Sequence, residues 1–146
     1  MSSMSSISSA DNCIFCKIAR NETNSYKVYE NEKVLAFLDI APVNKGHTLV
    51  IPKEHFETIL DIPNDILKEV VLVVKIVAIA LKKALNADGI SISINSYEAA
   101  GQKVKHAHFH IIPRYYGDGL RLWPQGTYEE GEMKIFKERI CKELKK

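Results

Sequence analysis

The spacing of apolar residues in the first third of the chain predicts three β-strands. Short apolar runs at 28–29 and 34–38 flank the turn-forming pair Asn31-Glu32, an arrangement typical of a β-hairpin. The run HTLVI within 46–53 lies between a glycine and a proline and is predicted to form a third strand. We therefore expect the domain to open with a hairpin that is followed by a further strand.

A longer apolar stretch, from about Asp65 to Leu85, is expected to be a helix although it is rich in valine and isoleucine. Its length exceeds that of an ordinary strand. Lys68, Lys75 and Lys82 recur every seven residues, which keeps them on one stripe of a helix. Because the other faces are apolar, we expect this helix to be buried on more than one side, for example by a sheet and by a second subunit.

Alternation of polar and apolar positions returns in the second half of the chain. The runs ISISINS, 90–96, and HAHFHIIP, 106–113, are both predicted to be strands. Thr127, followed three residues later by Glu130, predicts a capping box for a last helix over about 128–145. Strands in runs with segregated helices predict an α+β fold with an antiparallel sheet.

Length and composition are typical of one globular domain. The chain has 146 residues, 46% of them hydrophobic and 26% charged, so it can bury a core without disulfides. A net charge of +2 is too balanced to indicate nucleic acid or a membrane surface as a partner. The Ser-rich residues 1–10 are predicted to be a disordered tail without the features of a signal peptide, and 11–146 a single domain. The apolar run 70–81 is too short to span a membrane.

The three cysteines bear on location and on metal binding. An odd count without a secretory signal indicates a reducing compartment. Cys13 and Cys16 have the C-x-x-C spacing of half a zinc site, whereas Cys141 stands alone. Histidines would have to supply the two missing ligands. The alternative is that both cysteines are reduced thiols that hold no metal.

Three of the five histidines, His106, His108 and His110, occupy alternate positions. Residues two apart point in different directions on a helix, but on a strand they share one face and lie about 6.6 Å apart. The apolar residues between them then supply the opposite, core face. One strand is therefore expected to present three imidazoles to a polar site, either as metal ligands or as catalytic groups with a neutral imidazole as nucleophile.

The stretch AGQKVKHAHFHIIPR, 100–114, resembles the signature of the histidine triad (HIT) family of nucleotide hydrolases and transferases. NCIFCKI, VYENEKVLAFLDIAPVNKGHTLVIPKEH and INSYEAAGQ resemble the same family in the expected order, so the likeness covers about residues 12–114. The C-x-F-C-x-I opening is similar to the branch related to the purine-nucleoside phosphoramidases. AGQKVKH also resembles the diadenosine polyphosphate hydrolases.

The resemblance implies both a fold and a mechanism. The fold is an antiparallel sheet of about five strands with one long central helix and a C-terminal helix. His108 would attack the α-phosphorus of a nucleotide derivative, and water would then resolve the nucleotidyl-histidine. A hydrogen bond from its other ring nitrogen to a backbone carbonyl would fix its neutral form. His110 would donate to a phosphate oxygen, and His106 and His47 would complete the catalytic set.

The resemblance also implies substrate contacts. Asp39 would bind the ribose hydroxyls, although a side chain in this place before Pro42 could instead serve only to form the turn. The implied substrate-binding set is Asp39, Asn95, Gly101, Gln102, Val104, His108 and His110. Free backbone N–H groups in the segment before the histidines would cradle phosphate oxygens.

A structural zinc ion is implied as well. Its ligands would be Cys13, Cys16, His55 and His106. Four protein ligands leave no open position, so this zinc would tie the N-terminal segment to the sheet and would not activate water. No cofactor would be required for the chemistry.

Three functions remain open after these considerations. The leading one is hydrolysis of purine nucleoside 5′-phosphoramidates, and its rival is cleavage of dinucleoside polyphosphates. A third is a zinc-stabilised nucleotide-binding or adaptor module without significant catalysis. The resemblance further implies a homodimer with two sheets joined edge to edge. The reducing compartment indicated by the cysteines is expected to be the cytoplasm and, in a eukaryote, the nucleus as well.

Overall fold

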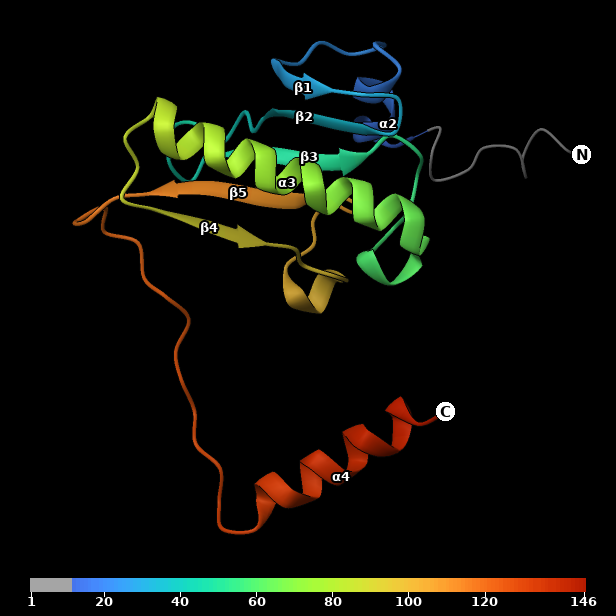
Figure 1. Ribbon diagram of the computed structural model, residues 1–146, viewed down its shortest axis with the longest axis vertical. Helices are drawn as coiled ribbons and strands as arrows, with labels where there is room; N and C mark the ends of the chain where they lie inside the picture. Colours follow the sequence, from blue (N-terminus) through green and yellow to red (C-terminus); the bar gives the residue numbers. More distant parts are fainter. Residues whose placement is uncertain (1–11) are drawn as a thin grey trace, which may run out of the picture.

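The computed structural model describes residues 12–146 and has a five-stranded antiparallel sheet at its centre, in the order β1-β2-β3-β5-β4 (Figure 1). The strands are β1 (Lys27–Glu30), β2 (Val34–Leu38), β3 (Thr48–Pro52), β4 (Gly89–Ser93) and β5 (Phe109–Arg114). The α-helices are α2 (Ile14–Ala19), α3 (Asn64–Ala84) and α4 (Glu132–Leu144), and 3-10 turns span Ile59–Asp61 and Glu98–Ala100. This arrangement confirms the α+β prediction. The predicted tail, 1–10, lies outside the described residues.

The hairpin at the start of the sheet forms as predicted. Its turn is closed by the side chain of Asn31, whose Oδ1 accepts from the amides of Lys33 at 2.9 Å and Val34 at 2.8 Å. Local side-chain bonds of this kind are the reason why asparagine is common in turns. A bulge between Lys27 and Tyr29 interrupts the pairing of β1 with β2.

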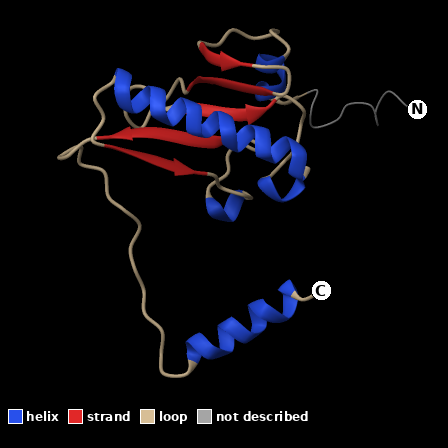
Figure 2. Cartoon of the chain, in the orientation of Figure 1, coloured by secondary structure: helices blue, strands red, loops and turns tan. Residues whose placement is uncertain are grey.

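The helix α3 packs across one face of the sheet, and the short helix α2 covers part of the other face, where β2 and β3 contribute (Figure 2). Alternate residues of each strand point to opposite faces. The cluster under α3 is formed by Val34, Ala36, Val50, Val70, Val73, Val74, Val77, Phe109 and Ile111. The cluster under α2 is formed by Cys13, Phe15, Cys16, Ile18, Leu35, Phe37, Leu49 and Ile51. The second cluster therefore brings the C-x-x-C segment onto the sheet.

The long helix α3 buries one face, through valines spaced i, i+3, i+4 and i+7 from Val70 to Val77. Burying one such side chain stabilises the fold by about 1.5–3 kcal/mol. The residues of the opposite face are exposed, among them Leu72 at 61% and Ile79 at 48%. The predicted helix is thus confirmed. Its predicted second buried side is not found within the described chain.

The histidine-bearing strand starts later than predicted. β5 begins at Phe109, three residues after the predicted start at His106. The ladder with β3 reaches only to the pair Val50–Phe109, and the amide of Ala107 instead donates to the carbonyl of Phe56 at 2.7 Å. His106 and His108 therefore belong to an irregular segment that is tied to the loop after β3. β4 is also shorter than the predicted 90–96 and ends at Ser93, which pairs with His110.

The last helix also differs from its prediction of 128–145. Gly131 has a φ of 84°, a left-handed conformation that cannot continue a helix, so α4 begins at Glu132. The predicted capping box of Thr127 and Glu130 was wrong. The carboxylate of Glu132 instead accepts from the amide of Glu129 at 2.6 Å.

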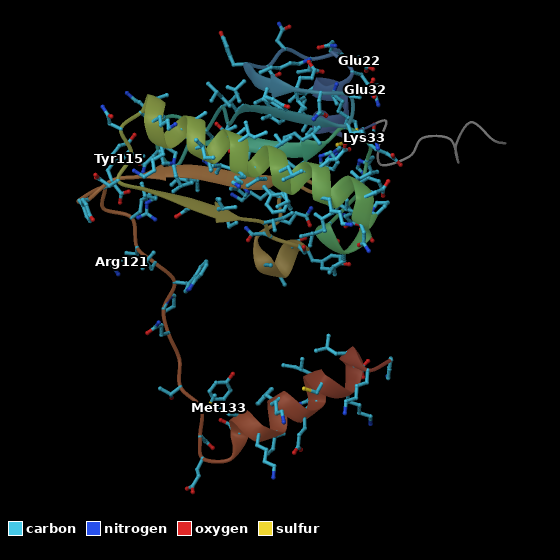
Figure 3. All side chains as sticks on the ribbon, viewed as in Figure 1. Glu22, Glu32, Lys33, Tyr115, Arg121 and Met133 are labelled. Atoms are coloured by element: carbon cyan, nitrogen blue, oxygen red, sulfur yellow. The ribbon has the colours of Figure 1, made fainter. Side chains whose placement is uncertain are left out.

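The segment after β5 runs away from the sheet and carries α4 with it (Figure 1). Along this arm, which we define as residues 117–146, Arg121 and Met133 lie progressively farther from Tyr115 at the end of the sheet (Figure 3). Trp123 on the arm is 83% exposed. Among residues 12–146, the helices all fall short of the length and hydropathy that a bilayer crossing requires.

Candidate active site and metal centre

The face of the sheet opposite α3 collects the imidazoles. Phe109 and Ile111 of β5 belong to the cluster under α3, so His110 between them points to the other face. The rings of His108 and His110 are 4.9 Å apart between centroids. His47, which immediately precedes β3, adds a third ring 5.1 Å from His110. The predicted separation of apolar and imidazole positions thus holds in space, although only His110 lies within the strand.

His106, the first residue of the triad, lies in a separate cluster with Cys13, Cys16 and His55. The Nδ1 atom of His106 is 3.3 Å from the Sγ atom of Cys13 and 3.4 Å from that of Cys16. The Nδ1 atom of His55 is 3.2 Å from the Sγ atom of Cys16. All four donor atoms lie within 4.8 Å of one another, which makes this set a candidate metal centre.

The donor set and its spacing fit a tetrahedral metal ion. Zinc bonds of about 2.0–2.3 Å place tetrahedral ligand atoms about 3.3–3.8 Å apart, close to the distances found here. The Nε2–H of His106 donates to the carbonyl of Pro52 at 2.8 Å, which leaves the Nδ1 lone pair facing the cysteines. Burial lowers the pKa of His106 to about 4, so the ring is neutral and able to bind a metal. The cluster could therefore hold a metal ion.

His108 is held as a neutral imidazole with one free lone pair. Its Nδ1–H donates to the carbonyl of His106 at 2.6 Å, so the lone pair is on Nε2. The residue is buried, with 8% of its surface exposed, and burial is the main cause that lowers its pKa. An uncharged nitrogen with an available lone pair is what nucleophilic attack requires.

A directed hydrogen bond joins His47 to His110. The amide of Val43 donates to the Nδ1 atom of His47 at 3.1 Å, which places the proton of His47 on Nε2. That Nε2–H is 2.9 Å from the Nδ1 atom of His110 and donates to it. The proton of His110 must then lie on Nε2. Burial lowers the pKa of His110 to about 4, so this neutral ring presents an N–H donor.

Asp39, His47 and His110 also have the residue types of a metal site, with donor atoms within 4.8 Å of one another. Their hydrogen bonds oppose such a use. A neutral His47 that bound a metal through Nε2 would need its proton on Nδ1, where it would meet the amide proton of Val43. The three residues are therefore arranged to direct a hydrogen bond toward His110.

The predicted substrate residue Asp39 is at the edge of this group. Its Oδ1 atom accepts from the amide of Ala41 at 2.8 Å, which is the turn-forming role that the sequence left open. Its Oδ2 atom lies 3.7 Å from the Nε2 atom of His47. One carboxylate oxygen therefore forms the turn, while ribose binding by Asp39 stays a prediction.

The predicted phosphate-binding segment is braced by Gln102. Its side-chain amide donates to the carbonyls of Glu57 at 2.6 Å and Val104 at 3.0 Å, and its Oε1 accepts from the amide of Tyr97 at 2.7 Å. Every hydrogen of that amide thus has a protein acceptor. Gln102 ties three segments together, and its predicted direct contact with phosphate remains untested.

Gly101 and Asn95 lie side by side near this segment. Gly101 has a φ of 99°, and a Cβ atom there would come within 3.4 Å of the Nδ2 atom of Asn95. The backbone conformation therefore favours glycine, whereas the contact with Asn95 would be an ordinary van der Waals distance. The predicted substrate roles of these two residues stay predictions.

Some determinants of the site carry no sequence signal. The amide of Val43 and the carbonyls of Pro52 and His106 decide which ring nitrogens carry protons, yet any residue could supply these backbone groups. Only the position of the chain reveals them. In the sequence, Pro52 at the end of the predicted third strand is the one position among these three where a turn of the chain could be expected.

The match to known proteins agrees with this geometry. The model of the HIT domain family matches residues 20–117, and the chain therefore belongs to the HIT family. It is 48% identical over 134 residues to an uncharacterized HIT-like protein of Methanocaldococcus jannaschii, a match that covers 91% of this chain and 98% of the relative. It is 38% identical over 136 residues to an adenosine 5′-monophosphoramidase of Schizosaccharomyces pombe, covering 91% of this chain and 98% of that enzyme.

Solved structures share the fold. A protein from Streptococcus mutans superposes with a TM-score of 0.86 at 42% identity, over 91% of this chain and 85% of that one. A zinc-bound histidine triad family protein from Mycobacterium smegmatis superposes with a TM-score of 0.73 at 34% identity, over 94% of this chain and 99% of that one. The predicted HIT-like fold is confirmed.

Proposed function

We propose that this protein is a nucleotide hydrolase or nucleotidyl transferase that acts on purine nucleoside 5′-phosphoramidates through a covalent nucleotidyl-His108 intermediate. The observation that carries the proposal is the bond from the Nδ1–H of His108 to the carbonyl of His106, which frees the Nε2 lone pair beside His110. The similarity to the Schizosaccharomyces pombe enzyme supports the choice of phosphoramidate.

The reaction follows from the positions of the protons. The Nε2 lone pair of His108 attacks the α-phosphorus, the P–N bond breaks, and the amine leaves with a proton from water. A second water then attacks the phosphorus, releases the nucleoside monophosphate and returns a proton to the solvent. His108 regains its lone pair, so the cycle balances.

His110 acts in this scheme as a hydrogen-bond donor to a phosphate oxygen. Its Nε2–H is fixed by the donation from His47, and its low pKa, about 4, keeps it neutral at pH 7. A donor that is oriented before the reaction stabilises the charge that develops on phosphorus without reorganisation. His47 contributes by keeping that donor in place.

We propose zinc as the metal of the Cys13–Cys16–His55–His106 cluster. The donor set and the likeness to the zinc-bound protein of Mycobacterium smegmatis support this identity. The metal would join the α2 turn to the segment that precedes β5. With four protein ligands it would have a structural role.

We propose a homodimer in which sheets meet edge to edge. The edge strand β4 carries Ile92 at 49% exposure, and α3 exposes an apolar face next to it. Both would be partly covered by a second copy, and covering an exposed strand edge is a common way to prevent aggregation. Sedimentation equilibrium would show a dimer mass if the proposal is right and a monomer mass if it is wrong.

A side-by-side assay tests the activity. We expect the wild type to release AMP from adenosine 5′-phosphoramidate, and His108→Ala to bind AMP without releasing it from the substrate. Diadenosine tri- and tetraphosphate form the second arm, because faster turnover of these would favour the rival substrate class. Nucleotide binding without turnover that depends on His108 would overturn the proposal in favour of a binding module.

A further inference from the structure

The turn that carries His47 is tied to the end of β5 by the side chain of Asn44. The Nδ2 atom of Asn44 donates to the carbonyl of Pro113 at 2.8 Å and to the Oδ2 atom of Asp118 at 3.2 Å. That carboxylate oxygen also accepts from the Nε atom of Arg114 at 2.7 Å, so it is fixed in its turn. Since two acceptors face the nitrogen, the orientation of the amide follows from its partners, and both of its hydrogens hold the turn against the strand.

The bond to Pro113 takes the place of a contact between strands. The ladder of β3 with β5 ends at the pair Thr48–Ile111, two residues before Pro113. Beyond that pair the chain leaves β3 for the turn, and the side-chain amide of Asn44 supplies the donor that a longer strand would have offered to the carbonyl of Pro113. The end of β5 thus serves as the fixed point to which the turn is attached.

The same turn decides which ring nitrogen of His47 carries the proton. The carbonyl of Asn44 accepts from the backbone amide of His47 at 3.0 Å. The amide of the preceding residue, Val43, donates to the Nδ1 atom of the ring at 3.1 Å. A neutral ring whose Nδ1 accepts must donate from Nε2, and His47 does so to His110 at 2.9 Å. The backbone on both sides of Asn44 therefore sets the tautomer of His47.

We propose that Asn44 is a positioning residue, which pins the turn 43–47 to the end of β5 and thereby fixes the tautomer of His47. Through His47 it keeps the Nε2–H of His110 available to a phosphate oxygen. This inference rests on the proposed function, in which His110 is that donor.

Removal of the Asn44 side chain should release the arrangement of protons. Without its anchor the turn can move away from β5, and the amide of Val43 no longer selects Nε2 as the protonated nitrogen of His47. An imidazole without such a partner populates both tautomers. When the proton of His47 is on Nδ1, its Nε2 atom becomes an acceptor and His110 donates to it from Nδ1. The Nε2 atom of His110 then has no hydrogen for the phosphate.

A double-mutant cycle tests whether Asn44 acts through His47. We expect Asn44→Ala to lower kcat for adenosine 5′-phosphoramidate about 3- to 10-fold, a loss no larger than that of His47→Ala. Adding Asn44→Ala to His47→Ala should change the rate less than about twofold, because the ring through which Asn44 acts is already gone. Losses that multiply in the double variant would overturn the proposal.

Asn31→Ala is the matched control for lost stability. Asn31 also closes a turn with its side chain, at the other end of β2, by accepting from the amides of Lys33 and Val34. Its truncation weakens a turn in the same way but should leave kcat near the wild-type value. Asn44→Gln keeps a donating amide on a longer side chain and should regain part of the rate. Equal losses of kcat in Asn44→Ala and Asn31→Ala would overturn the positioning role.

A spectroscopic readout separates failure of this inference from failure of the proposed function. The ¹⁵N shifts of the imidazole nitrogens report which of them carries the proton. We expect His47 and His110 to be protonated on Nε2 in the wild type and in Asn31→Ala, and to show mixed tautomers in Asn44→Ala. Unchanged ring signals in Asn44→Ala would refute the positioning role, whether or not the protein turns over nucleotides. A wild type with these tautomers but without turnover would refute only the proposed function.

Discussion

Two histidine clusters lie next to each other on one face of the sheet and use the imidazole in opposite ways. In the cluster with Cys13 and Cys16, His106 turns a lone pair toward its neighbours because its other nitrogen donates to the carbonyl of Pro52. In the second cluster, His47 turns an N–H toward His110 because its other nitrogen accepts from the amide of Val43. The backbone group behind the ring thus decides whether a histidine is suited to bind a metal or to donate a hydrogen bond.

The difference in backbone partners explains how three alternating histidines can have three different tasks. His106 faces the cysteines, His108 directs its free nitrogen away from the carbonyl that holds it, and His110 accepts a hydrogen bond from His47. The residue type is the same in each case. The partner of the second ring nitrogen differs, and this partner sets the chemistry.

The largest effect is expected from removing the proposed nucleophile. His108→Ala should lower kcat for adenosine 5′-phosphoramidate at least about 1,000-fold, because no other ring presents a free lone pair in the same place. AMP release measures the loss, and titration calorimetry with AMP should show binding retained. Residual activity above one tenth of the wild type would show that His108 is not the nucleophile.

The metal-type cluster should respond in stability and in metal content. Cys13→Ser or Cys16→Ser should abolish stoichiometric zinc binding and lower the free energy of unfolding by about 2–5 kcal/mol, since metal binding contributes to folding. Elemental analysis and thermal melts measure both quantities. Cys141→Ser is the matched control, because Cys141 is a free thiol on α4 and belongs to neither cluster. Full metal retention in both Cys13→Ser and Cys16→Ser would contradict the ligand set.

A smaller effect is expected from removing His47, which donates a hydrogen bond to His110. His47→Ala should reduce kcat about 10-fold, because His110 loses the N–H that fixes its tautomer. His47→Gln should retain more activity, since the glutamine amide can still donate to the Nδ1 atom of His110. Steady-state kinetics of the two variants provide the measurement. Equal rates for His47→Ala and the wild type would remove His47 from the catalytic set.

The smallest effect concerns pH. The pKa of His110 is lowered from 6.5 to about 4, chiefly by burial and then by the neighbouring His108 and His47. Between these values the unfolded chain binds more protons than the folded one, so His110 makes stability fall as the pH is lowered from 6.5 toward 4. The rate should be level at neutral pH and fall only below about pH 5, where His110 would acquire a second N–H opposite that of His47. A rate that declines already at pH 6.5 would show that the rings titrate normally.

Much of the fold follows from the pattern of side chains. The hairpin, the third strand and the 64–84 helix were predicted within a few residues, because alternation and the recurrence of Lys68, Lys75 and Lys82 express which faces are buried. The ends of the helices and strands were predicted less accurately. The start of β5 depends on a bond between Ala107 and the carbonyl of Phe56, two residues far apart in sequence.

The candidate site was predictable in its residues more than in its geometry. The triad, Cys13 and Cys16 stand out by spacing, and the structure brings His55 and His106 to the cysteines as the family resemblance implied. Gln102 shows the limit of such inference, since its polarity gave no sign that three backbone groups would engage its whole amide. The histidine tautomers could not be predicted either. They are set by backbone carbonyls and amides, and almost every residue carries both groups.

The exposed arm has an optical consequence. Trp123, which lies on this arm, is the single tryptophan of the chain and is 83% exposed. Intrinsic tryptophan fluorescence will therefore report the surroundings of the arm rather than melting of the sheet, which is better followed by circular dichroism. A blue shift of its emission as the protein is concentrated would be a direct signal that another surface has covered the indole.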